Sequence, residues 1–224
     1  MGIKDNIEKF RQEVKPYGAK LIAVSKTHPA EKIREAYEAG QRIFGENRVQ
    51  EMTDKQPNLP QDIVWHLIGH LQRNKVKYVA PFVSLIHSVD SLNLLEEINK
   101  QGQKADRIIP CLLQVFIARE ETKFGLDREE LLQVIQSPET ASFRYVMIEG
   151  LMAMATFTPD EKQIREEFRS LRKTFEQIKQ QPLAPNISMQ ELSMGMSSDY
   201  KIALEEGSTM VRVGTGIFGE RSKA

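Results

Sequence analysis

Short apolar runs alternate with longer amphipathic stretches along the whole chain. We interpret the apolar runs as strands near residues 20–25, 42–44, 62–68, 84–87, 108–115, 144–149, 187–192 and 210–213. This alternation is typical of βα units around a parallel sheet. Eight strands in a chain of 224 residues predict an α/β fold, a single-domain (β/α)8 TIM barrel over residues 1–224. An open doubly wound sheet is the alternative, but no Gly-x-Gly-x-x-Gly motif follows the first strand.

The clearest helical pattern runs from Asp160 to Gln180. Its apolar positions recur at spacings of three and four and predict one buried stripe of Ile164, Phe168, Leu171, Phe175 and Ile178. Thr158 is the predicted N-cap, with Pro159 at the first helical position and Glu161 completing a capping box. A second helix is predicted over residues 29–39, and a third is framed by Ser91 and Gly102.

Composition narrows the function classes. Lysine plus arginine equals aspartate plus glutamate at 31 each, so no net field attracts nucleic acid or an anionic membrane. Cys111 is the only cysteine, which excludes an internal disulfide, a cysteine-rich zinc site and a two-thiol mechanism. With neither a signal-peptide stretch nor a membrane span in the sequence, we expect a cytoplasmic protein without a metal site.

Candidate chemistry lies at the ends of the first and last predicted strands. Lys26 ends the first apolar run, and Gly214-Thr215-Gly216 follows the last run, which contains Arg212. Closing a barrel brings these strand ends together at one mouth. Glycines let the backbone approach a ligand closely, and the hydroxyls of Thr215 and Ser193 can donate to phosphate oxygens. The pattern therefore predicts a reactive amine that faces a phosphorylated aldehyde.

Each of these residues also has an ordinary structural interpretation. A lysine at a strand end is usually a solvated cation, and it becomes reactive only when it is desolvated or lies near another cation. Arg212 lies between valines that suit a buried strand, where a guanidinium needs a carboxylate or a ligand as its acceptor. The segment 192–199, expected as the loop after the seventh strand, carries methionines that can equally fill a core.

Six sequence blocks, in the same order, resemble those of the pyridoxal phosphate homeostasis proteins over nearly the whole chain. The blocks are residues 23–27 (AVSKT), 44–51 (FGENRVQE), 65–75 (WHLIGHLQRNK), 150–154 (GLMAM), 192–199 (LSMGMSSD) and 211–221 (VRVGTGIFGER). The resemblance implies a barrel like the N-terminal domain of alanine racemase, with pyridoxal 5′-phosphate (PLP) held as an internal aldimine on Lys26.

The resemblance also implies roles for other residues. The phosphate-binding positions of the family match Ser193, Gly214 and Thr215, with Ser197 as a further candidate. Arg212 matches the partner of the pyridine nitrogen, and Asn47 lies in a block that approaches the cofactor. His66 lies in a diagnostic block, where a structural hydrogen bond and a cofactor contact are equally compatible with its position.

These roles lead to the hypothesis of a non-catalytic carrier and buffer of PLP, a monomer that releases the cofactor to PLP-dependent apoenzymes. An arginine stays protonated beside the pyridine nitrogen, which disfavours transamination. A two-base racemase needs a second acid or base opposite the lysine. Alanine racemases take it from a separate β-domain, and we expect none in this chain.

Two alternative functions stay open. The first is a weak amino-acid racemase that uses Lys26 as one base and water or Tyr200 as the other. The second is a regulatory module that binds a protein partner and uses PLP occupancy as its signal. Neither alternative requires nucleic acid or a membrane.

Overall fold

The computed structural model describes residues 2–118 and 125–219. Within these residues, eight parallel strands form a closed barrel in the order of the chain. The strands are β1 Lys20–Val24, β2 Ile43–Glu46, β3 Val64–Leu67, β4 Leu85–Val89, β5 Ile109–Gln114, β6 Val146–Met152, β7 Ile187–Met196 and β8 Met210–Val213. Pairing of β1 with β8, which sets Ile22 opposite Arg212, closes the sheet. The predicted barrel is therefore confirmed.

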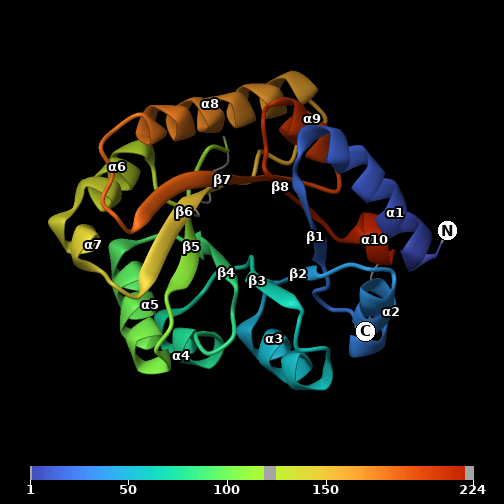
Figure 1. Ribbon diagram of the computed structural model, residues 1–224. Helices are drawn as coiled ribbons and strands as arrows, with labels where there is room; N and C mark the ends of the chain where they lie inside the picture. The colour runs from blue at the N-terminus through green and yellow to red at the C-terminus, as the bar shows by residue number, and fades with distance from the viewer. Residues whose placement is uncertain (1, 119–124, 220–224) are drawn as a thin grey trace.

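Helices surround the strands on the outside of the barrel (Figure 1). They are α1 Ile3–Val14, α2 Ala30–Glu38, α3 Val49–Lys55, α4 Val76–Val79, α5 Leu92–Ala105, α6 Arg128–Gln136, α7 Pro138–Ser142, α8 Glu161–Lys179, α9 Tyr200–Glu205 and α10 Thr215–Phe218. Most of the core lies between this ring and the outer face of the strands. A smaller apolar layer fills the barrel interior and consists of Ile22, Leu85, Leu112, Met152 and Met210. The interior is thus packed, as the barrel fold requires.

All eight predicted strands are present, but β7 is longer than its apolar run indicated. The expectation that the residues after 192 form a loop is wrong for residues 193–196, which belong to the strand. Ser193 pairs with Met152 on β6 and with Met210 on β8. Ladder hydrogen bonds on both sides outweigh the weak strand propensity of serine and glycine at this point.

The predicted helix over residues 160–180 is confirmed as α8, and its five stripe residues are all buried. The predicted N-cap is wrong by two residues. The carboxylate of Asp160 accepts hydrogen bonds from the backbone N–H groups of Lys162 and Gln163. Thr158 instead accepts one from the N–H of Asp160 and lies before the helix. Aspartate and threonine are both good caps, so sequence alone did not separate them.

The other two predicted helices are also present, with shifted ends. The helix α2 begins after Pro29, which occupies the N-cap position, and ends before Gly40. Ser91 caps α5 by accepting from the N–H of Leu94, but the helix continues past Gly102 to Ala105. A glycine inside a helix costs only about 1 kcal/mol relative to alanine, so packing against the barrel can carry the helix through it.

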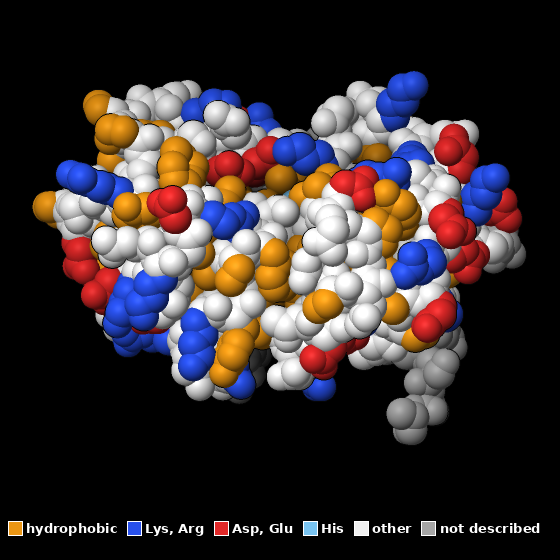
Figure 2. Space-filling view, turned by 60° about the horizontal axis from the view of Figure 1, so that its bottom comes forward, with side chains coloured by type: hydrophobic (Ala, Val, Ile, Leu, Met, Phe, Trp, Pro, Cys, Tyr) orange, Lys and Arg blue, Asp and Glu red, His pale blue; other side chains and the backbone are white. Residues whose placement is uncertain are grey.

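Among the residues that the structure describes, no helix is both long and apolar enough to span a bilayer. On the side drawn in Figure 2, basic and acidic side chains are interspersed across the surface. This mixture agrees with the zero formal charge of the sequence.

Candidate functional site

A buried ion cluster holds the turn that carries Lys26. Lys55, at the end of α3, contacts the carboxylates of Glu46 at 2.8 Å and Glu51 at 2.6 Å. Its ammonium also donates to the carbonyl oxygen of Ser25, whose hydroxyl donates to Glu46. Burial raises the pKa of Glu46, and Lys55 opposes that shift. The residue before Lys26 is therefore fixed by charged groups on two neighbouring elements.

The residue after Lys26 is held in the same way. Thr27 has φ +66°, in the left-handed region where a β-branched residue is an outlier. Its N–H donates to the carboxylate of Glu51, the same group that binds Lys55. A strained backbone conformation persists only where contacts with the surrounding residues hold it in place. Lys26 thus leaves β1 in a direction set from both sides by one cluster.

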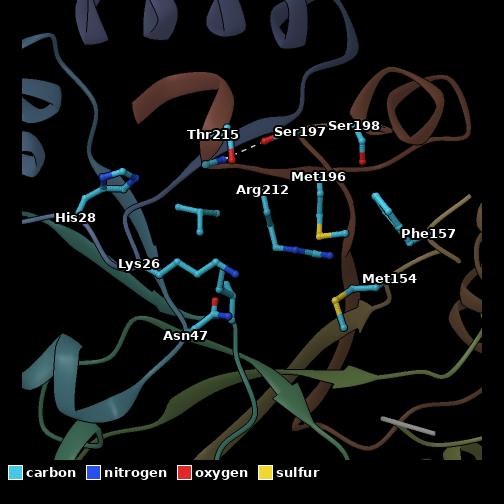
Figure 3. Close-up of a pocket in the computed structure, with 13 residues that line it drawn as sticks. Lys26, His28, Asn47, Met154, Phe157, Met196, Ser197, Ser198, Arg212 and Thr215 are labelled. Atoms are coloured by element: carbon cyan, nitrogen blue, oxygen red, sulfur yellow. Dashed lines mark hydrogen bonds between the residues drawn. The ribbon is translucent and has the colours of Figure 1, made fainter. Parts of the chain in front are cut away.

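A cavity of about 390 Å³ opens at the carboxyl ends of the strands. It is lined by Val24, Lys26, His28, Asn47, Ile68, Met154, Phe157, Met196, Ser197, Ser198, Arg212, Gly214 and Thr215. Figure 3 shows Lys26, Asn47 and Arg212 directed toward a common space, with Met154, Met196 and Phe157 on the side away from the lysine. The pocket therefore has one polar side and one apolar side.

The structure brings together five of the six residues that the sequence indicated as a site: Lys26, Asn47, Arg212, Gly214 and Thr215 all line the cavity. Ser193 is fully buried and does not line it. Its hydroxyl lies 2.6 Å from Arg212 and 3.0 Å from His87, inside the barrel. Glu220 and Arg221, the end of the last sequence block, lie outside the described residues.

Hydroxyl groups gather where β7 and β8 end. Ser197 accepts a hydrogen bond from the backbone N–H of Gly214 at 3.3 Å, the dashed line in Figure 3. Thr215 follows directly, and Ser197, Ser198 and Thr215 are all exposed to the cavity mouth. Small side chains and hydroxyl donors are what a phosphate group requires.

Arg212 is the buried cation of the pocket. One of its terminal nitrogens, Nη1, donates to the carbonyl and hydroxyl of Ser193, and the other, Nη2, donates to the carbonyl of Ala153. Burial lowers its pKa to about 10, against the favourable charge of Asp199. It is therefore protonated at pH 7. Across residues 2–118 and 125–219, no carboxylate forms a salt bridge with it.

Sequence reasoning missed the apolar side of the pocket and one histidine. His28 lines the cavity and packs against Phe218 with ring centroids 5.1 Å apart. Phe157 and Met154 are among the exposed large apolar side chains, at 90% and 40%. Their position after β6, in a fold where the βα loops form the mouth, was the available signal. His28 lies two residues after Lys26, in the loop after β1, so its position also indicated a place at the mouth.

Tyr200, the proposed second base, lies elsewhere. Its hydroxyl donates to Glu13 on α1, and its ring packs edge-on against Phe10 at 5.3 Å. Burial, followed by the bond to Glu13, raises its pKa. Tyr200 does not line the pocket, so the prediction that it acts opposite Lys26 is wrong.

Comparisons with known proteins agree with the geometry. The model of the family "Alanine racemase, N-terminal domain" matches residues 2–222. A pyridoxal phosphate homeostasis protein from Aquifex aeolicus is 42% identical over 204 residues, which cover 91% of this chain and 87% of the relative.

Solved structures give the same result. PipY from Synechococcus elongatus, solved without PLP, is 41% identical with a TM-score of 0.88 and covers 97% of this chain and 100% of its own. The same protein was also solved with PLP bound, at 40% identity and a TM-score of 0.86. Alanine racemase from Bartonella henselae is 18% identical with a TM-score of 0.72, covering 98% of this chain and 58% of its own, and so shares the fold.

Proposed function

The chain belongs to the family of pyridoxal phosphate homeostasis proteins, and from this premise we propose that it is a non-catalytic carrier that binds PLP reversibly at Lys26. The observation that supports this most is the convergence of Lys26, Arg212 and the loop ends at Ser197 and Thr215 on one cavity. PLP has an aldehyde, a ring nitrogen and a phosphate. In this proposal Lys26 binds the aldehyde, Arg212 faces the ring nitrogen, and the loop ends at Ser197 and Thr215 bind the phosphate.

The proposed contacts of the phosphate are Ser197, Gly214 and Thr215. The hydroxyl groups of Ser197 and Thr215 and the backbone of Gly214 lie together at the cavity mouth. In this proposal Ser193 is replaced by Ser197 as the phosphate-binding hydroxyl, because the Ser193 hydroxyl is already bonded within the barrel. Asn47, on the loop after β2, would contact the cofactor from the side of Lys26.

The N–H groups of Arg212 suit the pyridine ring of PLP. Arg212 is buried and donates to three protein oxygens, which leaves N–H groups with no assigned acceptor among the described residues, and an unprotonated ring nitrogen can accept from them. When bound, PLP supplies an aldehyde carbon that condenses reversibly with primary amines. Because Arg212 remains protonated, it disfavours a second positive charge on the ring nitrogen and makes the ring a poorer electron sink.

The composition of the pocket wall favours a carrier over a racemase. A two-base mechanism needs proton-exchanging groups on both sides of the substrate. Lys26 and His28 both come from the turn after β1. The side away from them presents Met154, Met196 and Phe157, which hold no exchangeable proton near neutral pH.

The carrier would exchange PLP with apoenzymes directly. Several residues that line the cavity, Ser198 and Phe157 among them, are exposed, which permits an incoming amine or protein to approach. We propose that residues 1–224 act as one cofactor-binding unit, as a monomer in the cytoplasm. A regulatory protein that distinguishes the loaded from the empty pocket would use the same mouth.

Absorption spectra with a transfer assay test the proposal. Purified protein is mixed with PLP, freed of excess and compared with Lys26→Ala and with the surface control Lys77→Ala. We expect a visible band in the wild type and Lys77→Ala only, and restoration of activity when a PLP-dependent apoenzyme is added. Lys26-dependent inversion of a free amino acid would instead establish the racemase.

A further inference from the structure

A chain of polar side chains crosses the interior of the barrel below the pocket. We call His66, His87, Ser193 and Arg212 the interior chain. His66 Nδ1 lies 3.0 Å from His87 Nε2, His87 Nδ1 lies 3.0 Å from Ser193 Oγ, and Arg212 Nη1 lies 2.6 Å from the same oxygen. The four residues come from β3, β4, β7 and β8. Neither histidine lines the cavity.

The interior chain lies next to the apolar layer. His87 and Arg212 each follow by two residues a member of that layer, Leu85 and Met210. Side chains two residues apart on a strand point to the same face, so these polar groups form the next layer toward the cavity. All four are at most 4% exposed. Buried polar groups at this depth require complete hydrogen bonding.

The contacts of the interior chain favour one direction for its hydrogens. Arg212 can only donate, so Ser193 Oγ is its acceptor. A serine oxygen could also accept a second hydrogen bond, but within the described residues His87 Nδ1 is the hydrogen-bond partner of this hydroxyl that can act as an acceptor, so the hydroxyl hydrogen is assigned to it. A histidine that accepts at Nδ1 carries its proton at Nε2, which donates to Nδ1 of His66. Both histidines are therefore Nε2-protonated.

Both histidines are also neutral at pH 7. In this direction each ring accepts a hydrogen bond at Nδ1, so that nitrogen is unprotonated in both histidines. Burial lowers the pKa of His66 to about 3. Burial, with the charges of His66 and Arg212, also lowers the pKa of His87. The interior chain thus keeps its direction over the physiological pH range.

The interior chain determines which hydrogens Arg212 can donate to a ligand. Both hydrogens of Nη1 are used on Ser193, and one of Nη2 is used on Ala153. Within the described residues, this leaves the Nε hydrogen and the second Nη2 hydrogen without an assigned acceptor. Because Arg212 lines the cavity, these two donors are the ones available to a bound ring.

We propose that Ser193, His87 and His66 are positioning residues, which act through Arg212 to hold its remaining N–H groups toward the cofactor. The identity of the ligand rests on the proposed function, whereas the direction of the chain does not. The diagnostic block that contains His66 then has a physical role, which is to anchor the far end of this chain.

The direct test is a measurement of histidine tautomers in the ligand-free protein. The chain contains four histidines, so ¹⁵N–¹H correlation spectra can be assigned with single glutamine variants of each. We expect His66 and His87 as neutral Nε2–H tautomers from pH 6 to 8. An Nδ1–H tautomer or a cationic ring at either position at pH 7 would overturn the proposal.

A second test measures the effect on the ligand. Ser193→Ala removes the acceptor of Arg212, while the matched control Ser88→Ala removes another buried hydroxyl, which donates to the carbonyl of Gly69. We expect Ser193→Ala to weaken PLP binding about tenfold, as for a hydrogen bond to a charged group, and to shift the visible band. Ser88→Ala should stay within about twofold of wild type.

The outcomes separate the two proposals. Equal PLP affinity and equal spectra in Ser193→Ala and Ser88→Ala would refute the positioning role. Should Ser193→Ala not fold, the tautomer measurement on the wild type decides alone. Absence of any visible band in the wild type would contradict the proposed function, and the spectra of the ligand-free protein would still decide the direction of the interior chain.

Discussion

At the scale of single residues, the position of Lys26 depends on charges that do not line the pocket. Lys55 is buried between Glu46 and Glu51, and Glu46 is completely shielded from water. Within the described residues, one Glu46 oxygen has no hydrogen-bond partner. Removing the only cation of such a cluster leaves buried charge uncompensated, which is costly.

Lys55→Met should therefore lower the free energy of unfolding by about 3–5 kcal/mol. Urea denaturation measures the loss, with the exposed Lys77→Met as a control that should change it by less than about 0.5 kcal/mol. Combining Lys55→Met with Glu46→Gln should recover part of the loss, because the buried charge is then removed. A loss below about 1 kcal/mol in the single variant would mean that the cluster does not hold this turn.

The buried histidines make stability depend on pH. The pKa of His66 is about 3 in the folded protein and 6.5 for an unperturbed histidine. Below pH 6.5 the unfolded chain takes up a proton that the folded protein does not, so stability is present above that pH and is lost as pH falls. The loss from this residue is about 2 kcal/mol between pH 6 and pH 4.5.

His66→Gln should accordingly show a shallower decrease in unfolding free energy from pH 6 to 4.5 than the wild type. Gln72→Ala, which changes an exposed side chain without an ionisable group, should keep the wild-type slope. Glu46, Glu149 and Asp199 have raised pKa values and contribute in the opposite direction, but they are shared by all three proteins. Identical slopes would show that His66 is not buried as a neutral ring.

At the scale of elements, β6 and β7 approach each other at Gly150. This residue has φ +156°, and a Cβ atom there would lie 1.8 Å from the carbonyl oxygen of Glu191. The pairing of the two strands shifts register at this point. Only glycine permits this contact between backbones.

Gly150→Ala should thus destabilise the fold by more than about 4 kcal/mol or prevent folding, because backbone must move. Gly18→Ala provides the comparison. Gly18 also has positive φ, but nothing lies within 4 Å of its Cβ position, so its cost should be about 1 kcal/mol. Thermal unfolding with circular dichroism ranks the two variants. Equal costs would mean that β6 and β7 can separate at Gly150 without loss.

Most elements were predictable from apolar periodicity alone. The eight runs correspond to the eight strands, since a barrel strand is buried on both faces. The end of β7 was not predictable, because Ser193 and Gly195 have loop propensities and only their neighbours on β6 and β8 determine their state. The N-cap of α8 was missed because Thr158 and Asp160, two residues apart, are both good capping residues.

At the scale of the whole molecule, barrel closure converts distant sequence motifs into one cavity. Sequence order and strand ends were enough to predict that Lys26, Arg212 and Thr215 meet. They were not enough for Ser193, because the register decides whether a serine faces the cavity or the barrel interior. The apolar side of the pocket was likewise missed, because residue type alone does not tell whether a methionine or phenylalanine lies in the core or at the cavity mouth.

The exposed mouth predicts ready exchange with small amines. Ser197, Ser198, Thr215, Met154 and Phe157 all line the cavity and are solvent exposed. Adding hydroxylamine to the loaded protein should abolish the visible band at a rate proportional to its concentration. A rate that saturates at low concentration would show that the pocket must open first, which would contradict direct exchange.

The most direct measurement of the central claim is the site of attachment of the cofactor. The protein is loaded with PLP, reduced with borohydride and digested, and mass spectrometry identifies the modified lysine. We predict that the pyridoxyl group is found on Lys26 and is absent from Lys26→Ala. Modification spread over other lysines, with Lys26 unlabelled, would contradict the account.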